Sequence, residues 1–198
     1  MVHNTKSKRT LWANLGPLAV VTVVLVLIIV GVVHLWHQSR IIGDIMISQE
    51  VTKLQKIFKR IDETCGIIGF EHERNYIDFL TVKAFVGSEV GAMNLARPDK
   101  WEGPYANDNP TIQERLFEIV RTAKGYYIVP GQGVKLNNGM VMGKSLNVAK
   151  DDDIERMIIP GGPLNFDGNA LAARLDFKLL AVEEKEGDRL TLVGGIDD

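Results

Sequence analysis

The sequence predicts an α+β protein in which a long N-terminal helix, a membrane span continuing into an amphipathic half, packs on a small antiparallel sheet. Two observations indicate this class. A helical pattern without proline occupies the chain from Arg40 to Thr64, and hairpin signals follow from Arg115 onward. Because the helix comes first and the antiparallel strands come later, the arrangement expected is a sheet laid on the helix.

The first element is predicted from an apolar run, Leu15 to Trp36, in which Thr22 is the only polar side chain between Leu18 and Val33. As a helix, this run rises about 33 Å, close to the roughly 30 Å of a bilayer's hydrocarbon core. A cleaved signal peptide would have an apolar core of about 7–15 residues and a small-x-small site after it. No such site follows the run, so we expect an uncleaved signal-anchor.

The flanking charges predict the orientation. Three basic residues precede the run, and only Arg40 follows closely. The positive-inside rule then places the N-terminus in the cytoplasm and the rest of the chain in the periplasm, with the span in the inner membrane. The expected parts are a cytoplasmic tail (1–14), a transmembrane helix (15–36), an amphipathic helix continuing it (37–64) and an extracytoplasmic α+β domain (65–198).

An apolar stripe continues the helical pattern beyond the span, with successive spacings of four, three, four and three residues. The stripe consists of Ile47, Val51, Leu54, Phe58 and Ile61. Two partners for it remain open. It could form a coiled coil between copies of the chain, or it could pack on the chain's own domain. Three heptads without clearly alternating e/g charges favour packing on the domain.

The stretch Arg97–Ile112 breaks regular structure, because it holds three prolines with glycine, asparagine and aspartate beside them. Trp101 and Tyr105 bracket a Gly-Pro turn, Gly103-Pro104. A ligand-binding loop would need convergent polar groups, whereas a corner of the fold would need an aromatic anchor flanked by turns. The residues therefore favour a structural corner.

The remaining strands are predicted from turn chemistry. Alternation over Arg115–Thr122, a turn at Lys124-Gly125 and the following YYIVPG indicate one hairpin. Asn138-Gly139 indicates a second, since this pair suits a type I′ turn. One short helix is expected after an aspartate cap within 151–153, and a terminal hairpin is expected from ARLDFKLLAV and RLTLVGG. Residues 66–99 have mixed periodicity, and YIDFLTVKAFVG fits either a short helix or a strand.

Composition excludes several classes of function. The part after Arg40 has 19 basic and 25 acidic residues, so binding of nucleic acid is not expected. A single cysteine, Cys65, allows neither an intrachain disulfide nor a cysteine zinc site, and a buried small residue is expected there. No P-loop, serine elbow or His-Glu-x-x-His motif is present, so no catalysis is expected.

The pattern of the chain resembles the pilin superfamily, and most closely the major pseudopilins of type II secretion. The resemblance covers about residues 15–143 and is carried by the apolar helix, a W-x-G-P-Y corner and a hairpin ending in Y-x-x-P-G. It implies a structural role in folding for Trp101, Gly103, Pro104, Tyr105, Asn109, Pro110, Tyr127, Pro130 and Gly131. The chain lacks the family's glycine before the apolar run and its assembly glutamate, as no acidic residue precedes Asp44.

The resemblance also implies calcium binding in the C-terminal region, where Asp151, Asp152 and Asp153 could supply carboxylate oxygens. A solvated helix cap is the other interpretation of these residues, and no cofactor is otherwise expected. The function expected is a single-pass, membrane-anchored, pilin-like structural or interaction subunit of an envelope or secretion-type assembly. Its partners would be membrane lipid and other protein subunits, including copies of itself. The alternative is a membrane-tethered extracytoplasmic ligand-binding module.

Overall fold

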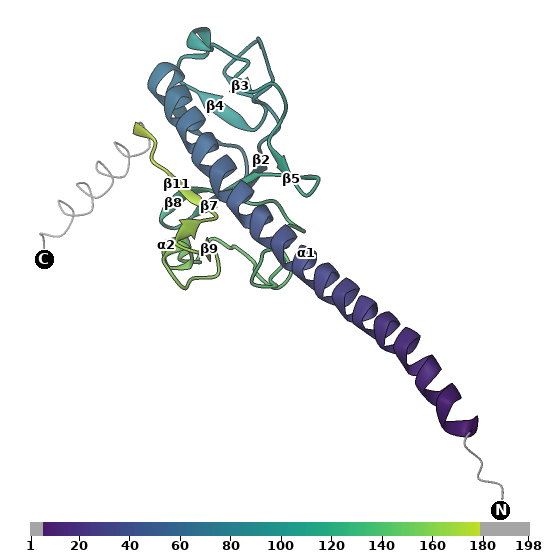
Figure 1. Cartoon of the computed structure of the whole chain (residues 1–198). Helices are drawn as coiled ribbons and strands as arrows, with labels where there is room; N and C mark the ends of the chain where they lie inside the picture. Colours follow the sequence, from purple (N-terminus) through teal and green to yellow (C-terminus); the bar gives the residue numbers. More distant parts are fainter. Residues whose placement is uncertain (1–5, 179–198) are drawn as a thin grey trace, which may run out of the picture. The chain divides into compact units, whose positions relative to one another are not determined.

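The computed structural model describes the backbone of residues 6–178 and the side chains of residues 19–35 and 43–178 (Figure 1). The chain divides into two compact units, Met1–Ile42 and Gly43–Asp198. The described part is a small α+β protein whose helices are α1 (Lys6–Cys65), the 3-10 helix η1 (Pro98–Lys100) and α2 (Ile154–Ile158). Every strand of the described residues lies in the second unit, which is here called the folded unit.

Four small antiparallel sheets make up the folded unit. The largest has the order β11-β8-β7-β2, and a three-stranded sheet has the order β1-β4-β3. The strands of these two sheets are β1 (Ile67–Phe70), β2 (Arg74–Tyr76), β3 (Glu89–Val90), β4 (Met93–Leu95), β7 (Glu118–Thr122), β8 (Gly125–Val129) and β11 (Ala173–Leu175). Two further pairs are β5 (Thr111–Ile112) with β6 (Arg115–Leu116) and β9 (Asn165–Phe166) with β10 (Asn169–Ala170).

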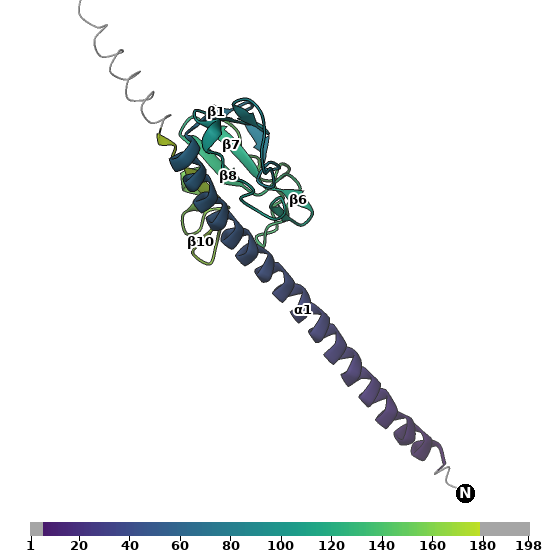
Figure 2. The ribbon, with the colours of Figure 1, turned by 90° about the horizontal axis from the view of Figure 1, so that it is seen from above.

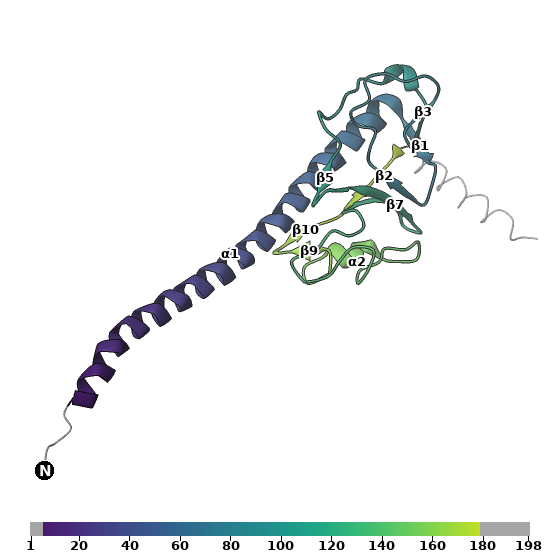
Figure 3. The same ribbon diagram turned by 90° about the vertical axis from the view of Figure 1, so that its right-hand side faces the viewer.

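The sheets are spread along the part of α1 that begins at Gly43. Figure 3 shows β1 and β3 at one end of the folded unit, and β9, β10 and α2 at the other. Strands β7 and β8 lie beside α1 in Figure 1 and again in the view from above in Figure 2. The helix therefore connects small sheets that do not join one another.

The core of the folded unit forms where the apolar stripe of α1 meets the strands. The stripe residues Ile47, Val51, Leu54, Phe58 and Ile61 are at most 1% exposed, and Cys65 is buried at the end of the same helix. Phe58 packs edge-on against Phe70 and Phe79, with ring centroids 6.4 and 6.2 Å away. The stripe thus packs inside its own unit, and its side chains are not available to a second copy.

The predicted architecture, a pilin-like long helix packed on one small sheet, is wrong. The helix does not act as one element, because only its part from Gly43 onward belongs to the folded unit, and that part packs on several small sheets rather than one. Four small sheets take the place of one because the strands are two to five residues long. Proline and glycine turns separate these strands, and the short pairs cannot extend into a common sheet.

The predicted membrane anchor is also wrong. Within the part of the chain that the structure describes, no helical segment combines the length and the apolar character needed to cross a membrane. This finding overturns the transmembrane helix, the signal-anchor and the inner-membrane location with an internal N-terminus.

Two hairpin predictions can be compared directly with the structure. The hairpin at Lys124-Gly125 is confirmed, since β7 and β8 pair from Glu118 with Val129 to Thr122 with Gly125. The Asn138-Gly139 turn is confirmed as a turn, but it closes only an isolated bridge between Lys135 and Val141. The second strand of the predicted terminal hairpin falls in 179–198, outside the described residues.

Candidate functional site

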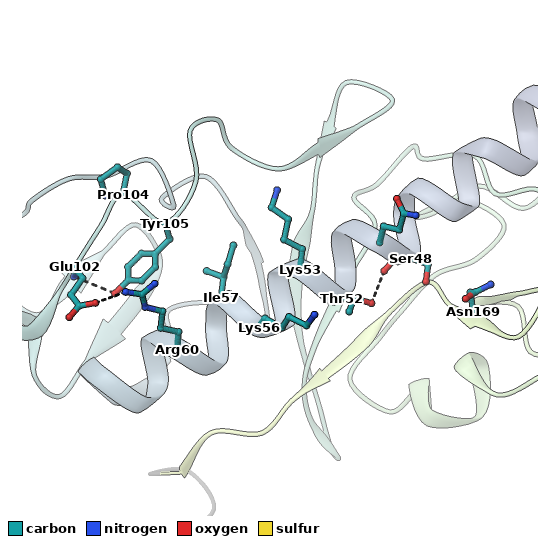
Figure 4. Close-up of a pocket in the computed structure, with 11 residues that line it drawn as sticks. Ser48, Thr52, Lys53, Lys56, Ile57, Arg60, Glu102, Pro104, Tyr105 and Asn169 are labelled. Carbon is teal, nitrogen blue, oxygen red and sulfur yellow. Dashed lines mark hydrogen bonds and ion pairs between the residues drawn. The ribbon is translucent and has the colours of Figure 1, made fainter.

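An open groove in the folded unit lies between one face of α1 and the loop that contains the W-E-G-P-Y stretch. Its cavity volume is about 750 Å³. Ser48, Gln49, Thr52, Lys53, Lys56, Ile57 and Arg60 line the helix side, Glu102, Pro104 and Tyr105 the loop side, and Asn169 one end. Figure 4 shows Tyr105 and Glu102 near Arg60 at one end of the groove, and Asn169 near Ser48 at the other.

The helix side of this groove, here called the helix–loop groove, is basic. Lys53, Lys56 and Arg60 follow one another at spacings of three and four residues, which places them on a single helix face. Lys53 forms an ion pair with Glu50 at 3.0 Å, and Arg60 forms one with Glu102 at 2.8 Å. Lys56 has no carboxylate partner among the described residues, so the face keeps a net positive charge.

The loop side is held in place by aromatic and backbone contacts. The indole Nε1 of Trp101 donates to the carbonyl oxygen of Val82 at 3.1 Å, and the backbone N–H of Tyr105 donates to Leu80 at 2.8 Å. The rings of Trp101 and Tyr105 meet edge-on, with centroids 4.8 Å apart. Phe85 packs against the other side of Trp101 at 5.5 Å. These contacts fix Tyr105 as a wall of the groove.

Gly103 permits this packing because it has no side chain. A Cβ atom there would overlap both the indole Nε1 of Trp101 and the carbonyl oxygen of Val82. The following peptide bond, Gly103–Pro104, is cis. The Trp101–Val82 hydrogen bond therefore depends on glycine at position 103.

Tyr105 connects the aromatic and the basic sides of the groove. The guanidinium carbon of Arg60 lies 5.9 Å from the centre of the Tyr105 ring, within the range of a cation–π contact. The Tyr105 hydroxyl accepts a hydrogen bond from the backbone N–H of Glu102 at 3.3 Å. Burial, the largest cause, raises the pKa of the Tyr105 phenol above 10.0, so the phenol is neutral near pH 7.

The groove continues into two neighbouring hollows. One of about 540 Å³ shares Lys53, Pro104 and Tyr105 with it and extends along the loop to Asn109 and Pro110. The Oδ1 atom of Asn109 is buried without a hydrogen-bond partner among the described residues. The other hollow, about 480 Å³, shares Lys56 and contains the last described residues. The groove and the two hollows that share lining residues with it are here called the basic track.

The residues of the predicted corner do not all lie together. Pro104 and Tyr105 line the groove, Trp101 packs against Tyr105, and Asn109 and Pro110 line the neighbouring hollow. Gly103 lies beside the Trp101 indole. The others lie at β8. Tyr127 is fully buried, and its hydroxyl lies 3.3 Å from Oε1 of Glu155. Pro130 and Gly131 follow β8 and are buried, with Gly131 packed against the carbonyl oxygen of Leu116.

Two of the three aspartates proposed for calcium, Asp152 and Asp153, are engaged with the protein itself. Oδ2 of Asp153 lies 2.6 Å from Lys124 Nζ and 3.3 Å from Arg156 Nε, and the hydrogen bond from Lys124 lowers the pKa of this carboxyl group. Oδ2 of Asp152 accepts the backbone N–H of Ala149 at 2.6 Å. Asp153 occupies the cap position of α2 but forms no capping hydrogen bond. No cluster of three histidine, cysteine or acidic side chains suited to a metal occurs among the described residues.

Sequence reasoning found Tyr105 but missed the basic face opposite it. Lys53, Lys56 and Arg60 were expected only as the solvent side of a helix, since charges between apolar positions usually face water. A signal was present, because four basic residues fall within 53–60 in an otherwise acidic region. The loop that faces them is 42 residues away from Arg60, and no local pattern places it there.

No family model matches this chain, and neither a curated protein nor a solved structure matches it. The resemblance to the pilin superfamily therefore rests on the sequence pattern alone.

Proposed function

We propose that the chain is a non-catalytic interaction subunit of a larger protein assembly, and that it binds a partner protein through the helix–loop groove. One observation carries the proposal: a basic helix face and a fixed aromatic wall line the same open groove. Tyrosine and arginine are enriched at protein-binding surfaces because they combine large contact area with hydrogen bonding. Both line this groove.

The lining chemistry supports binding rather than catalysis. The groove residues include neither histidine nor cysteine, and their only carboxylate, Glu102, is paired with Arg60. The hydroxyl of Thr52 donates to the carbonyl oxygen of Ser48 at 2.9 Å, so it faces no general base. A nucleophile would need an activating base within hydrogen-bond reach. The groove offers cations, an aromatic ring and amides, which suit recognition.

The dimensions favour an extended polypeptide over a compact ligand. A volume of about 750 Å³ alone would also suit a small molecule, since such pockets measure roughly 300–1,000 Å³. However, Lys53, Pro104 and Tyr105 belong to the groove and also to the next hollow. A chain lying along α1 could fill both hollows in sequence. The ligand-binding module remains the alternative, and the same experiment distinguishes it.

The test places a photo-crosslinking amino acid at position 56 of the full-length chain, in cells that express it naturally. The matched control carries the same amino acid in place of Lys144, an exposed lysine outside the groove. We expect one defined protein to be captured from position 56 and not from 144, with at least a fivefold loss when Tyr105→Ala is added. Equal capture at both positions would contradict the proposal. Retention of a small molecule, with no captured protein, would favour the alternative.

A further inference from the structure

Two exposed cations beside the groove form no ion pair among the described residues, although Asp62, Glu63 and Asp176 line the same hollow. Lys56 lines the groove, and Lys59 follows one turn later on α1. Neither forms an ion pair within residues 43–178, whereas Lys53 and Arg60 on the same helix are paired. The surrounding unit is slightly acidic, with 19 acidic and 17 basic residues in 43–178. The positive charge at Lys56 and Lys59 is thus local, and it suits an acidic occupant.

The chain leaves its described part directly beside these cations. Oδ2 of the buried Asp62 accepts the backbone N–H of Lys178 at 3.0 Å, which fixes Lys178 against the end of α1. Lys178 and Phe177 line the hollow that also contains Lys56 and Lys59. The segment that follows Lys178 therefore starts from a point next to the groove.

The sequence after Lys178 contains an acidic segment at a suitable distance. Residues 183–188 read EEKEGD, with four carboxylates and one lysine. At no more than about 3.6 Å per residue, the five residues from Lys178 to Glu183 span at most about 18 Å. Asp62, which anchors Lys178, lies three helical residues from Lys59 and nine from Lys53, which corresponds to about 5 and about 14 Å along α1. Both distances are shorter than the span of the linker, so the acidic segment can reach these cations.

We propose that residues 183–188 of this chain occupy the basic track of the same molecule, with Glu183 and Glu184 facing Lys56 and Lys59. The inference deepens the proposed function and rests on it, because it names the chemistry the groove recognises: an acidic, extended polypeptide. Attachment through a short linker gives the segment an effective concentration of the order of millimolar, so docking within one molecule is favoured over exchange between molecules. A partner protein must then compete with this segment.

The experiment uses zero-length carbodiimide cross-linking of the purified full-length chain, which joins a carboxylate to an amine only when the two are in contact. We expect Glu183 or Glu184 to be joined to Lys56 or Lys59 at least fivefold more often than to Lys144. Because screening lengths shrink to about 3 Å in 1 M salt, the yield should fall at least threefold there. Yields at Lys56 and Lys59 no higher than at Lys144 would overturn the proposal.

Two controls separate the competing explanations. An equimolar mixture of ¹⁴N and ¹⁵N chains reports exchange, and mixed-isotope links making up half of the product would show docking between molecules and contradict the proposal. A variant with Glu183→Gln, Glu184→Gln, Glu186→Gln and Asp188→Asn should accelerate acetylation of Lys56 at least threefold, with Lys144 unchanged. An unchanged rate at Lys56 would also overturn docking. If position 56 captures a partner protein but the intramolecular links to Lys56 and Lys59 do not form, this inference alone is contradicted. If the intramolecular links form but position 56 captures no partner protein, the proposed function alone is contradicted.

Discussion

At the scale of single residues, the corner between Trp101 and Tyr105 shows how glycine shapes the groove. The sequence indicated a turn with aromatic residues on both sides. The structure explains why the turn contains glycine at position 103: the Trp101 indole and the carbonyl group of Val82 leave no space there for a Cβ atom. The residue types could be interpreted from sequence, but the contact with Val82 could not, because that residue lies 19 positions away.

Replacing Gly103 with alanine should therefore destabilise the folded unit. The added Cβ must displace the indole or the backbone of Val82, and such overpacking costs about 1–3 kcal/mol. Urea unfolding, followed by tryptophan fluorescence, measures the effect. Gly69→Ala is the matched control, since a Cβ there would meet only the Tyr126 hydroxyl at 3.8 Å. Equal stability of the two variants would contradict the proposed packing.

Asp44 provides a prediction about pH. Its side chain is 2% exposed, and Oδ2 accepts the backbone N–H of Asn137 at 3.0 Å. Burial raises the pKa of this carboxyl group above 3.8, and the hydrogen bond from Asn137 opposes the shift. The folded state therefore binds the proton more tightly than the unfolded state does. The contribution of Asp44 to stability then falls as pH rises from about 4 through the folded-state pKa.

An Asp44→Asn variant should remove this dependence, because an amide oxygen can still accept the N–H of Asn137. We expect the free energy of unfolding of the variant, minus that of the wild type, to be larger at pH 7 than at pH 4. Chemical denaturation at both pH values measures it, with Asp78→Asn at an exposed site as control. A difference that shrinks as pH rises would show that the Asn137 bond outweighs the burial.

At the scale of secondary-structure elements, the four-stranded sheet depends on a buried ion pair between its strands. Glu118 on β7 is fully buried, and its carboxylate pairs with Arg74 on β2. Oε1 of Glu118 also accepts the backbone N–H of Gln132 at 3.0 Å, and Arg74 donates to the carbonyl oxygen of Val148 at 2.7 Å. Four chain segments meet at this pair.

Removing both partners of this pair should cost less than the sum of removing each one alone. Arg74→Ala leaves the fully buried Glu118 carboxylate without its guanidinium, and leaving a buried charge unpaired in this way costs about 3–5 kcal/mol. The double variant Glu118→Ala with Arg74→Ala should lose less than the sum of the single variants, by at least 1 kcal/mol in a double-mutant cycle. Additive losses, measured by urea unfolding, would mean that the two residues act independently.

The same elements show what sequence could predict. Hairpins with local turn signals, such as β7 and β8, follow from residues next to one another, and the short helix after Asp153 was also predicted. The stretch Tyr76–Gly87 was expected as a helix or a strand, but only Tyr76, at the end of β2, belongs to either. Its backbone bonds instead to distant segments, from Ile77 N–H to Phe117 and from Tyr105 N–H to Leu80. Such long-range bonds leave no periodicity in the local sequence.

The partners of buried charges were missed for a similar reason. Alternation places Glu118 beside Leu116 and Val120 on one strand face, and Asp62 lies between the apolar positions of the helix, but neither pattern predicts what pairs with these carboxylates. Asp62 is 4% exposed, and its carboxylate accepts the backbone N–H groups of Ile67 and Lys178, each at 3.0 Å. Lys178 lies 116 residues away. Only the assembled fold brings that partner to the helix end.

At the scale of the whole molecule, the division after Ile42 decides which part of the helical pattern builds the fold. The apolar run and the apolar stripe were predicted as a transmembrane helix and an amphipathic helix that continues it. In the structure they belong to different compact units, and the stripe contributes its side chains to the core of the second. The first unit has a different character, since its described side chains at 19–35 are all exposed. Periodicity identified both stretches, but not the boundary between the units.

The division predicts that the second unit folds without the first. A chain starting at Gly43 keeps the whole stripe from Ile47 to Ile61 and every strand. We expect its thermal transition, followed by circular dichroism, to remain cooperative and to lie within about 3 °C of the corresponding transition in the full-length chain. A chain starting at Ile57 is the control, because it lacks the buried side chains of Ile47, Val51 and Leu54.

Each of those three side chains is at most 1% exposed, and loss of a buried Ile or Leu side chain costs roughly 2–5 kcal/mol. A domain typically has a free energy of unfolding of about 5–15 kcal/mol. The combined loss of the three side chains removes most or all of that free energy. The shorter chain should therefore show no cooperative transition. If the chain from Gly43 also failed to unfold cooperatively, residues 1–42 would have to contribute to the fold, and the two-unit division would be wrong.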